Sequence, residues 1–283
     1  MMRLRNIRVM GRRNLTKRCK DAKVQRCKGK KKMGWAILLI FLFFAVGCHA
    51  EDESWVRIQE SGVLRVGLDP TFPPFENVDE SGLHGFDIDL ANEIAANLGL
   101  QTEFVLFGYD GLYDALGTGQ VDVLISALVI IPERMRDFAY SEPYFNAGEI
   151  LIVQESDDAI AEMADLNGRS LSVELGTQGH VAATTWQRKL NNLTVLPFNT
   201  PEEAITAVSD TTADATLIDA ISGRLFLSST PGLKRLPDPV TVEPFAIVVR
   251  IDDTQLLENL NNSLEKIQAS GELESITARW LDQ

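Results

Sequence analysis

The feature that most constrains the fold is an alternation of short apolar segments with segments of helical periodicity. Val63–Leu68 and Glu103–Phe107 have the composition of β-strands. Between them, apolar residues recur at every fourth position from Phe86 to Leu98, which predicts a helix with one apolar face, and Gly99 follows where such a helix would end. Strands that alternate with helices predict an α/β fold with mostly parallel sheets.

The same alternation begins again after Tyr144, which predicts a second sheet. The strands expected there are 150–153, 170–173, 194–197, 213–218 and 245–249, and the expected helices are 180–190, 201–208, 254–269 and 272–281. Earlier in the chain, residues 111–116 are expected to form a short helix and residues 121–131 a long buried strand. The 236 residues from Cys48 onward suffice for one large domain or two lobes.

Residues 1–47 differ in composition from the rest of the chain. They contain 14 of the 27 Lys and Arg residues but only one acid. A lysine cluster at 28–32 precedes 12 apolar residues, Trp35–Val46, and Cys48 follows closely. A basic region, a short apolar stretch and small residues form a secretory signal, and this stretch is too short for a comfortable transmembrane helix. We therefore expect 1–47 to be a signal peptide or leader.

The end of this leader, Ala45–Cys48, resembles a bacterial lipobox, in which the Cys is acylated and becomes the first residue of the mature protein. The resemblance implies lipidation of Cys48 and a lipid-anchored tether at 48–53, within a polar stretch that continues to Glu60. The protein would then reside outside the cytoplasm, in the periplasm or at the cell surface. An uncleaved anchor with an incidental Cys is the alternative.

Charge excludes several classes of partner. From residue 48 onward the chain has 13 basic and 39 acidic side chains, so it repels nucleic acid and anionic membrane surfaces. It has no Cys after Cys48, which excludes an internal disulfide and a Cys-based metal site in that part of the sequence. We expect no metal, no cofactor and no nucleic-acid partner.

Arg134 is the leading candidate for a binding residue. It follows the apolar run 121–131, where a buried strand is expected to end. Open α/β sheets bind their ligands at the carboxyl ends of strands, and the planar guanidinium group of Arg fits a carboxylate with two hydrogen bonds. The alternative is a surface Arg that pairs with Glu133 or Asp137.

Several segments, in this order along the chain, resemble one family. They are Asp69–Glu76, Gly85–Ala95, Pro132–Arg134 with Tyr140–Tyr144, and Ala213–Asp219. They resemble the bacterial extracellular solute-binding proteins of family 3, the polar amino acid-binding proteins that serve ABC transporters. The resemblance covers residues 54–283.

This resemblance implies a two-lobed fold of the periplasmic-binding-protein type II, with two mixed, mostly parallel sheets joined by a two-segment hinge. Lobe 1 would comprise 54–144 and 246–283, and lobe 2 would comprise 148–242. The crossing segments would lie near 144–147 and 243–245. A ligand that bridges both lobes would bias the hinge toward closure.

A free amino acid carries a carboxylate and an ammonium group, and lobe 2 offers a group for each. Thr177 and Gln178 lie in a Gly-rich turn before an expected helix, whose N–H groups and dipole would bind the carboxylate opposite Arg134. An ordinary strand-to-helix turn is the alternative. Asp219 ends an expected strand and suits the ammonium group, although it could instead, or also, cap the following helix.

The resemblance adds four further positions in lobe 1. Phe72 and Tyr109 match the residues whose rings sandwich the ligand, with cation–π attraction when the ligand is charged. Core packing is the alternative for both rings. Ser126 and Ala127 match positions whose side chain and backbone carbonyl face the ligand.

Three positions bear on the ligand's identity. Asp69 and Glu174 match side-chain subsites, and two carboxylates there favour a ligand with a basic or polar side chain. Either acid could instead face solvent. Val129 stands where the family commonly has Thr, whose hydroxyl group helps to bind the ligand's carboxylate or amine. Either a hydrogen bond worth on the order of 1 kcal/mol is lost, or the ligand's polar head differs from that of an α-amino acid.

The predicted function is that of a monomeric, non-enzymatic extracytoplasmic binding protein. It would capture an amino acid by lobe closure and deliver it to the permease of an ABC importer. One alternative is an enzyme on the same scaffold, similar to cyclohexadienyl dehydratase, with Glu174 as its acid and His180 assisting. The other is a ligand-sensing protein without transport.

Overall fold

The computed structural model of the protein describes residues 53–282. The expected signal peptide, Cys48 and residues 48–52 of the expected tether lie outside this part. Within the described range, no helix combines the length and apolar character needed to cross a membrane.

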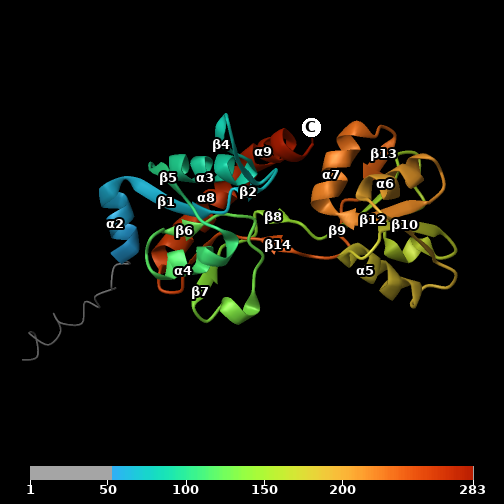
Figure 1. Ribbon diagram of the computed structural model, residues 1–283, viewed down its shortest axis with the longest axis horizontal. Helices are drawn as coiled ribbons and strands as arrows, with labels where there is room; N and C mark the ends of the chain where they lie inside the picture. The colour runs from blue at the N-terminus through green and yellow to red at the C-terminus, as the bar shows by residue number, and fades with distance from the viewer. Residues whose placement is uncertain (1–52, 283) are drawn as a thin grey trace, which may run out of the picture. The chain divides into compact units, whose positions relative to one another are not determined.

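The sheet of lobe 1 has five strands in the order β5-β1-β6-β15-β7 (Figure 1). Their bounds are β1 Val63–Leu68, β5 Gln101–Leu106, β6 Val123–Leu124, β7 Phe138–Tyr140 and β15 Val248–Arg250. β1 pairs in parallel with β5 and β6, whereas β15 pairs antiparallel with β6 and β7. This is the mixed, mostly parallel sheet that the alternation of elements predicts.

Helices bury their apolar stripes on both faces of this sheet. On one face, α3 (Phe86–Asn97) shares a hydrophobic core with α8 (Thr254–Ser270) and α9 (Glu272–Leu281), the two helices that close the chain. On the other face, α4 (Leu112–Gly117) packs around Leu124 and Leu128 in a second cluster. The C-terminal helices thus complete lobe 1, although they are distant from it in sequence.

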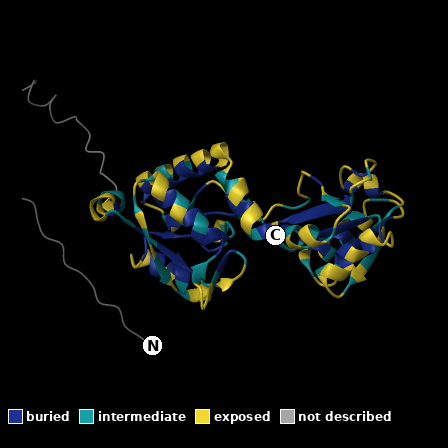
Figure 2. Ribbon diagram, turned by 90° about the horizontal axis from the view of Figure 1, so that it is seen from above, coloured by how far each residue is buried: buried dark blue, intermediate teal, exposed yellow. Residues whose placement is uncertain are grey.

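The sheet of lobe 2 has the order β11-β10-β12-β9-β13. Its strands are β9 Glu149–Gln154, β10 Ser170–Glu174, β11 Thr194–Phe198, β12 Ala215–Asp219 and β13 Leu233–Arg235. The helices α5 (Gln178–Gln187), α6 (Pro201–Ser209) and α7 (Ala220–Ser229) pack against this sheet. Its central strands are buried on both faces (Figure 2).

Two short strands connect the lobes. β8 (Phe145–Asn146) pairs antiparallel with β14 (Pro244–Phe245), and both phenylalanine rings pack edge-on against the buried ring of Phe75. The ladder is extended by a hydrogen bond from the Tyr144 N–H group to the Phe245 carbonyl oxygen, at 3.0 Å. Both crossing segments are thus tied to the aromatic core of lobe 1.

The expectation of one long strand at 121–131 is wrong. Regular pairing in β6 stops at Leu124, and the chain turns at Ala127, whose φ of 45° lies in the left-handed region. Val129 then forms an isolated bridge with Phe245, and Pro132–Arg134 is a 3-10 helix, η2. An Ala at positive φ gives no warning in the sequence, because such turns normally carry Gly or Asn.

Three smaller expectations also need correction. The polar stretch expected as a tether contains a helix, α2 (Glu53–Ser61), which buries Ile58. The segment Asp69–Glu76, to which no strand was assigned, contributes to a three-stranded sheet of β2 (Thr71–Phe72), β3 (Glu76–Asp79) and β4 (Gly82–His84). The strand expected at 245–249 is divided between β14 and β15, because the chain passes there from the hinge to the lobe 1 sheet.

Candidate functional site

A cavity of about 230 Å³ opens in lobe 1 and brings together five residues singled out from the sequence. Its lining consists of Asp69, Thr71, Phe72, Glu76, Tyr109, Ser126 and Ala127. These residues come from three separate segments that meet near the carboxyl ends of β1 and β6. A concave site with a few convergent polar groups is where a small ligand is expected.

Two aromatic rings border this cavity and are exposed. The side chains of Phe72 and Tyr109 keep 44% and 57% of their accessible surface, so neither ring belongs to the hydrophobic core. The Phe72 ring rests on Phe75, with ring centroids 5.9 Å apart and an interplanar angle of 21°. Both rings therefore offer a free surface to a ligand.

Asp69 organises the loops around the cavity. Its Oδ2 accepts a hydrogen bond from the Tyr109 N–H group at 2.8 Å, and its Oδ1 accepts one from the Thr71 hydroxyl group at 2.8 Å. Its backbone N–H group donates to the Ser126 hydroxyl oxygen at 3.0 Å. The carboxylate is half-buried and retains lone pairs for a ligand, so a structural role and a binding role are compatible.

Beneath Ser126 and Ala127 lie two buried acids that the sequence reasoning did not single out. The Ser126 hydroxyl group donates to Glu76 Oε1 at 2.6 Å, and the Ala127 N–H group donates to Asp87 Oδ2 at 2.6 Å. Glu76 and Asp87 are 1% and 0% exposed. Both lie in motifs quoted for the family resemblance, but an acid after a Pro-rich loop or at a helix start is normally solvated.

Burial changes the acidity of both groups. Loss of water, reinforced by the nearby charge of Asp87, raises the pKa of Glu76 to about 10. Burial likewise raises the pKa of Asp87 to about 6, while the hydrogen bonds that it accepts act in the opposite direction. Burial therefore favours a proton on this pair of carboxyl groups, and the larger rise in pKa is that of Glu76.

Arg134 is exposed on η2, and its guanidinium carbon lies 3.9 Å from the centroid of the Tyr113 ring. Within the described part of the chain it forms no ion pair with Glu133 or Asp137; Asp137 instead accepts a hydrogen bond from Arg136 Nε at 2.9 Å. The surface ion pair considered for Arg134 is therefore absent, and its donors are free to meet a carboxylate. Arg134 does not line the 230 Å³ cavity.

In lobe 2, the turn before α5 uses much of its own hydrogen-bonding capacity. Thr177 caps α5, because its hydroxyl oxygen accepts from the His180 N–H group at 3.3 Å. The Gly176 N–H group donates to His180 Nδ1 at 3.2 Å, and the Thr177 N–H group makes a long contact of 3.5 Å with the Glu174 carbonyl oxygen. The Gly179 N–H group is directed at the Glu149 carboxyl group. An anion at this turn would therefore rely mainly on the Gln178 amide and on the helix dipole.

Asp219 caps α7, as the alternative interpretation held. Its Oδ1 accepts hydrogen bonds from the N–H groups of Ile221 and Ser222, at 3.1 and 2.9 Å. Its Oδ2 receives no hydrogen bond from any residue in the described range and is free to accept from an ammonium group. Capping fixes the carboxylate in orientation without occupying it fully.

Glu149 is a further acid that sequence reasoning missed. It lies opposite Asp219 in the antiparallel pairing of β9 with β12, is 5% exposed, and its Oε2 has no hydrogen-bond partner in the described range. Burial, reinforced by the charge of Asp219, raises the pKa of Glu149 to about 7. A Cβ atom on Gly179 would come within 2.6 Å of Oε2, so a larger residue at this position would displace the carboxyl group.

A search against family models matches residues 64–283 to the bacterial extracellular solute-binding proteins, family 3. The chain belongs to this family. A probable amino-acid ABC transporter-binding protein of Haemophilus influenzae is 27% identical over 250 residues, which cover 87% of this chain and 94% of that protein.

Two solved structures show the same two-lobed fold. An ancestral cationic amino acid solute-binding protein is 32% identical, with a TM-score of 0.59, and the match covers 80% of this chain and 98% of that protein. An ancestral cyclohexadienyl dehydratase is 25% identical, with a TM-score of 0.69, and the match covers 80% of this chain and 95% of that protein. The fold of this solute-binding protein is therefore that expected from its sequence.

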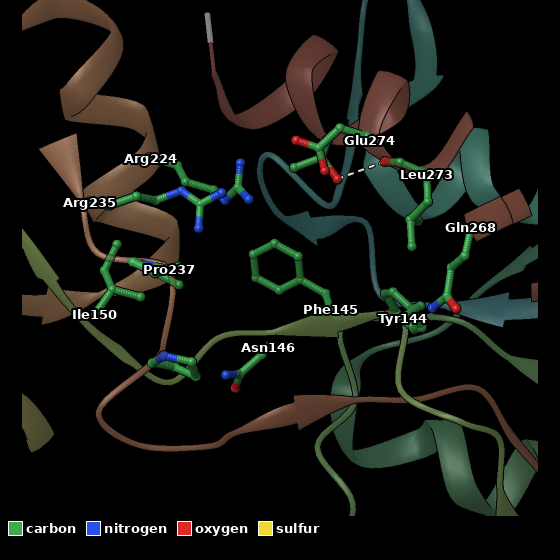
Figure 3. Close-up of a pocket in the computed structure, with 13 residues that line it drawn as sticks. Tyr144, Phe145, Asn146, Ile150, Arg224, Arg235, Pro237, Gln268, Leu273 and Glu274 are labelled. Carbon is green, nitrogen blue, oxygen red and sulfur yellow. Dashed lines mark hydrogen bonds between the residues drawn. The ribbon is translucent and has the colours of Figure 1, made fainter. Parts of the chain in front are cut away.

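The solute-binding protein has a second cavity, of about 430 Å³, bordered by β8, α7 and the turn between α8 and α9. Figure 3 shows the Arg224 and Arg235 side chains lying side by side above the Phe145 ring. Arg224 Nη1 lies 2.9 Å from both carboxylate oxygens of Asp282. None of the binding residues expected from the sequence lines this cavity, whereas five of them line the cavity of about 230 Å³.

Proposed function

We propose that this solute-binding protein captures a free amino acid outside the cytoplasm and delivers it to the permease of an ABC importer. Two observations in lobe 1 carry the proposal. The guanidinium group of Arg134 has no ion pair within the described residues and lies over the Tyr113 ring, and a separate cavity is bordered by two exposed aromatic rings. A carboxylate suits the guanidinium group, and an apolar or cationic side chain suits the rings. Lipid anchoring at Cys48 and a monomeric state belong to the same proposal.

The ligand class we favour is an amino acid with a basic or polar side chain. Asp69 faces the lobe 1 cavity, and Glu149 and Asp219 lie together in lobe 2 without a cationic partner in the described range. Carboxylates gathered without counter-ions repel one another, and a cationic ligand relieves that repulsion. The related ancestral structure that is described as a cationic amino acid-binding protein supports this class.

The direct test is a thermal-shift screen of residues 48–283 against the twenty amino acids and common polyamines. A ligand present at 100 times its dissociation constant should stabilise the protein by about 2.7 kcal/mol. We expect the largest shift with arginine, lysine or histidine. If no amino acid moves the melting curve, the proposed function is wrong.

Glu149 provides a second test of the ligand class. A bound cation would favour the ionised form of Glu149, so the wild type should release protons on binding a basic amino acid near pH 7. The charges of Asp219, Glu243 and Glu174 favour a proton on this carboxyl group, and a cationic ligand has to displace that proton. Affinity should therefore fall as the pH drops below 7. Glu149→Gln should abolish most of the release.

Calorimetry in two buffers of different ionisation enthalpy measures this release directly. The matched control is Glu155→Gln, an exposed acid just after β9. An unchanged release in Glu149→Gln would show that the proton comes from another group.

The second candidate function is a dehydratase, which the match to the ancestral cyclohexadienyl dehydratase favours. Glu149 would be the better acid for it than Glu174, because its raised pKa keeps a proton available near neutral pH. Incubation with a cyclohexadienyl acid, followed by ultraviolet absorbance of the aromatic product, distinguishes the two functions.

A further inference from the structure

A chain of hydrogen bonds with one interruption runs from the ligand cavity toward the hinge. The Asp69 N–H group donates to Ser126 Oγ, and the Ser126 hydroxyl group donates to Glu76 Oε1. At the other end, Asp87 Oδ2 accepts from the Ala127 N–H group and, at 3.1 Å, from the Tyr144 hydroxyl group. Tyr144 immediately precedes β8, the first crossing segment.

The chain is interrupted at one place only within the described residues. Glu76 Oε2 and Asp87 Oδ1 are both buried and neither has a hydrogen-bond partner when both groups are treated as carboxylates. The two carboxyl groups nevertheless face one another closely enough for each to shift the pKa of the other. Two facing buried carboxylates are unfavourable, and a single proton between them removes the conflict.

The number of hydrogen bonds that each carboxyl group accepts indicates which of them carries the proton. Asp87 Oδ2 already accepts two hydrogen bonds, which favours a negative charge on Asp87. Glu76 accepts only one, from Ser126. A proton on Glu76 Oε2, donated to Asp87 Oδ1, satisfies every buried oxygen of the pair.

We propose that Glu76 and Asp87 share one proton and act as positioning residues, which hold the Ser126–Ala127 turn in its ligand-binding geometry and tie it to Tyr144 at the hinge. This inference rests on the proposed function, because the turn lines the proposed ligand cavity. Ala127 has a φ of 45°, a conformation that a non-Gly residue keeps only when its surroundings hold it there. The short bond from its N–H group to Asp87 is such a restraint.

The shared proton can be tested with amide variants, because the N–H group of an amide can take the place of the proton between the two side chains. In Glu76→Gln an amide N–H group faces the Asp87 carboxylate, and in Asp87→Asn an amide N–H group faces an ionised Glu76. Each single variant keeps one hydrogen between the two side chains. The double variant has one hydrogen too many, so an N–H group meets an N–H group or the amide flips and disturbs Ser126.

We therefore expect a strongly non-additive double-mutant cycle in the absence of ligand. Near pH 7, the melting temperatures of Glu76→Gln and of Asp87→Asn should each lie no more than about 3 °C below that of the wild type. The double variant should melt at least about 5 °C below both single variants, because it leaves a buried donor unsatisfied. If the double variant melted as high as the single variants, the shared proton would be overturned. If the single variants melted as low as a destabilised double variant, it would be overturned as well.

Ligand binding tests the positioning role separately. The amino acid that gives the largest thermal shift is titrated calorimetrically into the wild type, Glu76→Ala and Glu76→Gln. We expect the dissociation constant to rise at least tenfold in Glu76→Ala and to return to within about threefold of wild type in Glu76→Gln. Unchanged affinity in folded Glu76→Ala would overturn the positioning role. If the wild type binds no amino acid, the proposed function and the positioning role both fall, and the melting temperatures still decide the shared proton.

Discussion

Arg134→Ala should weaken amino-acid binding by on the order of 100-fold while leaving the unliganded protein folded. The change removes a charge-assisted, bidentate pair of hydrogen bonds to the ligand carboxylate, and loss of such a partner costs about 3 kcal/mol of binding free energy. The guanidinium group is exposed and its one aromatic contact is with Tyr113, so the cost to stability should stay within about 1 kcal/mol. Calorimetric titration and a thermal melt of the same sample separate the two effects.

The chain offers a matched control two residues away. Arg136 is also an exposed Arg, with 83% of its side-chain surface accessible, but it is paired with Asp137. Arg136→Ala should leave affinity within about twofold of the wild type, because a surface ion pair contributes little. If Arg134→Ala and Arg136→Ala bound equally well, the carboxylate of the ligand would have to be held elsewhere, and the turn at Gln178 would be the next candidate.

Much of the fold is predictable from local patterns. The alternation of strands and helices predicts both sheets, and β1 and α9 begin and end where expected. The prediction of a strand over residues 121–131 failed because the sequence of a β-branched run does not show whether the run continues as a strand or turns after four residues. The turn at Ala127 is imposed by Asp87, which comes from α3 and is 40 residues earlier in the chain. Such a tertiary restraint has no local signature.

The residues of the candidate site also fall into a group that the sequence identifies and a group that only the fold reveals. Asp69, Phe72 and Tyr109 were singled out because they match positions of the family, and the structure brings all three to one cavity. Glu76, Asp87 and Glu149 were not. Each becomes notable only through burial and through a second acid that the fold brings close. Sequence alone shows an acid-rich chain, in which three buried acids cannot be told apart from the solvated ones.

Glu76→Gln should make the stability of the protein less dependent on pH. The pKa of Glu76 is about 10 in the folded protein, against an ordinary value of 4.5, so the folded state holds a proton that the unfolded chain releases. The stability contributed by this proton is fully present below pH 4.5 and is lost progressively as the pH rises toward 10. Between pH 5 and pH 8.5 the wild type should lose about 4 kcal/mol from this group.

Gln cannot titrate, and its amide group can replace the protonated carboxyl group toward both Ser126 and Asp87. The difference in unfolding free energy between Glu76→Gln and the wild type should therefore grow by about 4 kcal/mol from pH 5 to pH 8.5, in favour of the variant. Urea unfolding at the two pH values measures it. Glu80→Gln, an exposed acid in the turn after β3, is the control and should show a constant difference. A constant difference in Glu76→Gln too would mean that Glu76 is ionised in the folded protein, and the buried pair would then need a cation rather than a proton to hold it together.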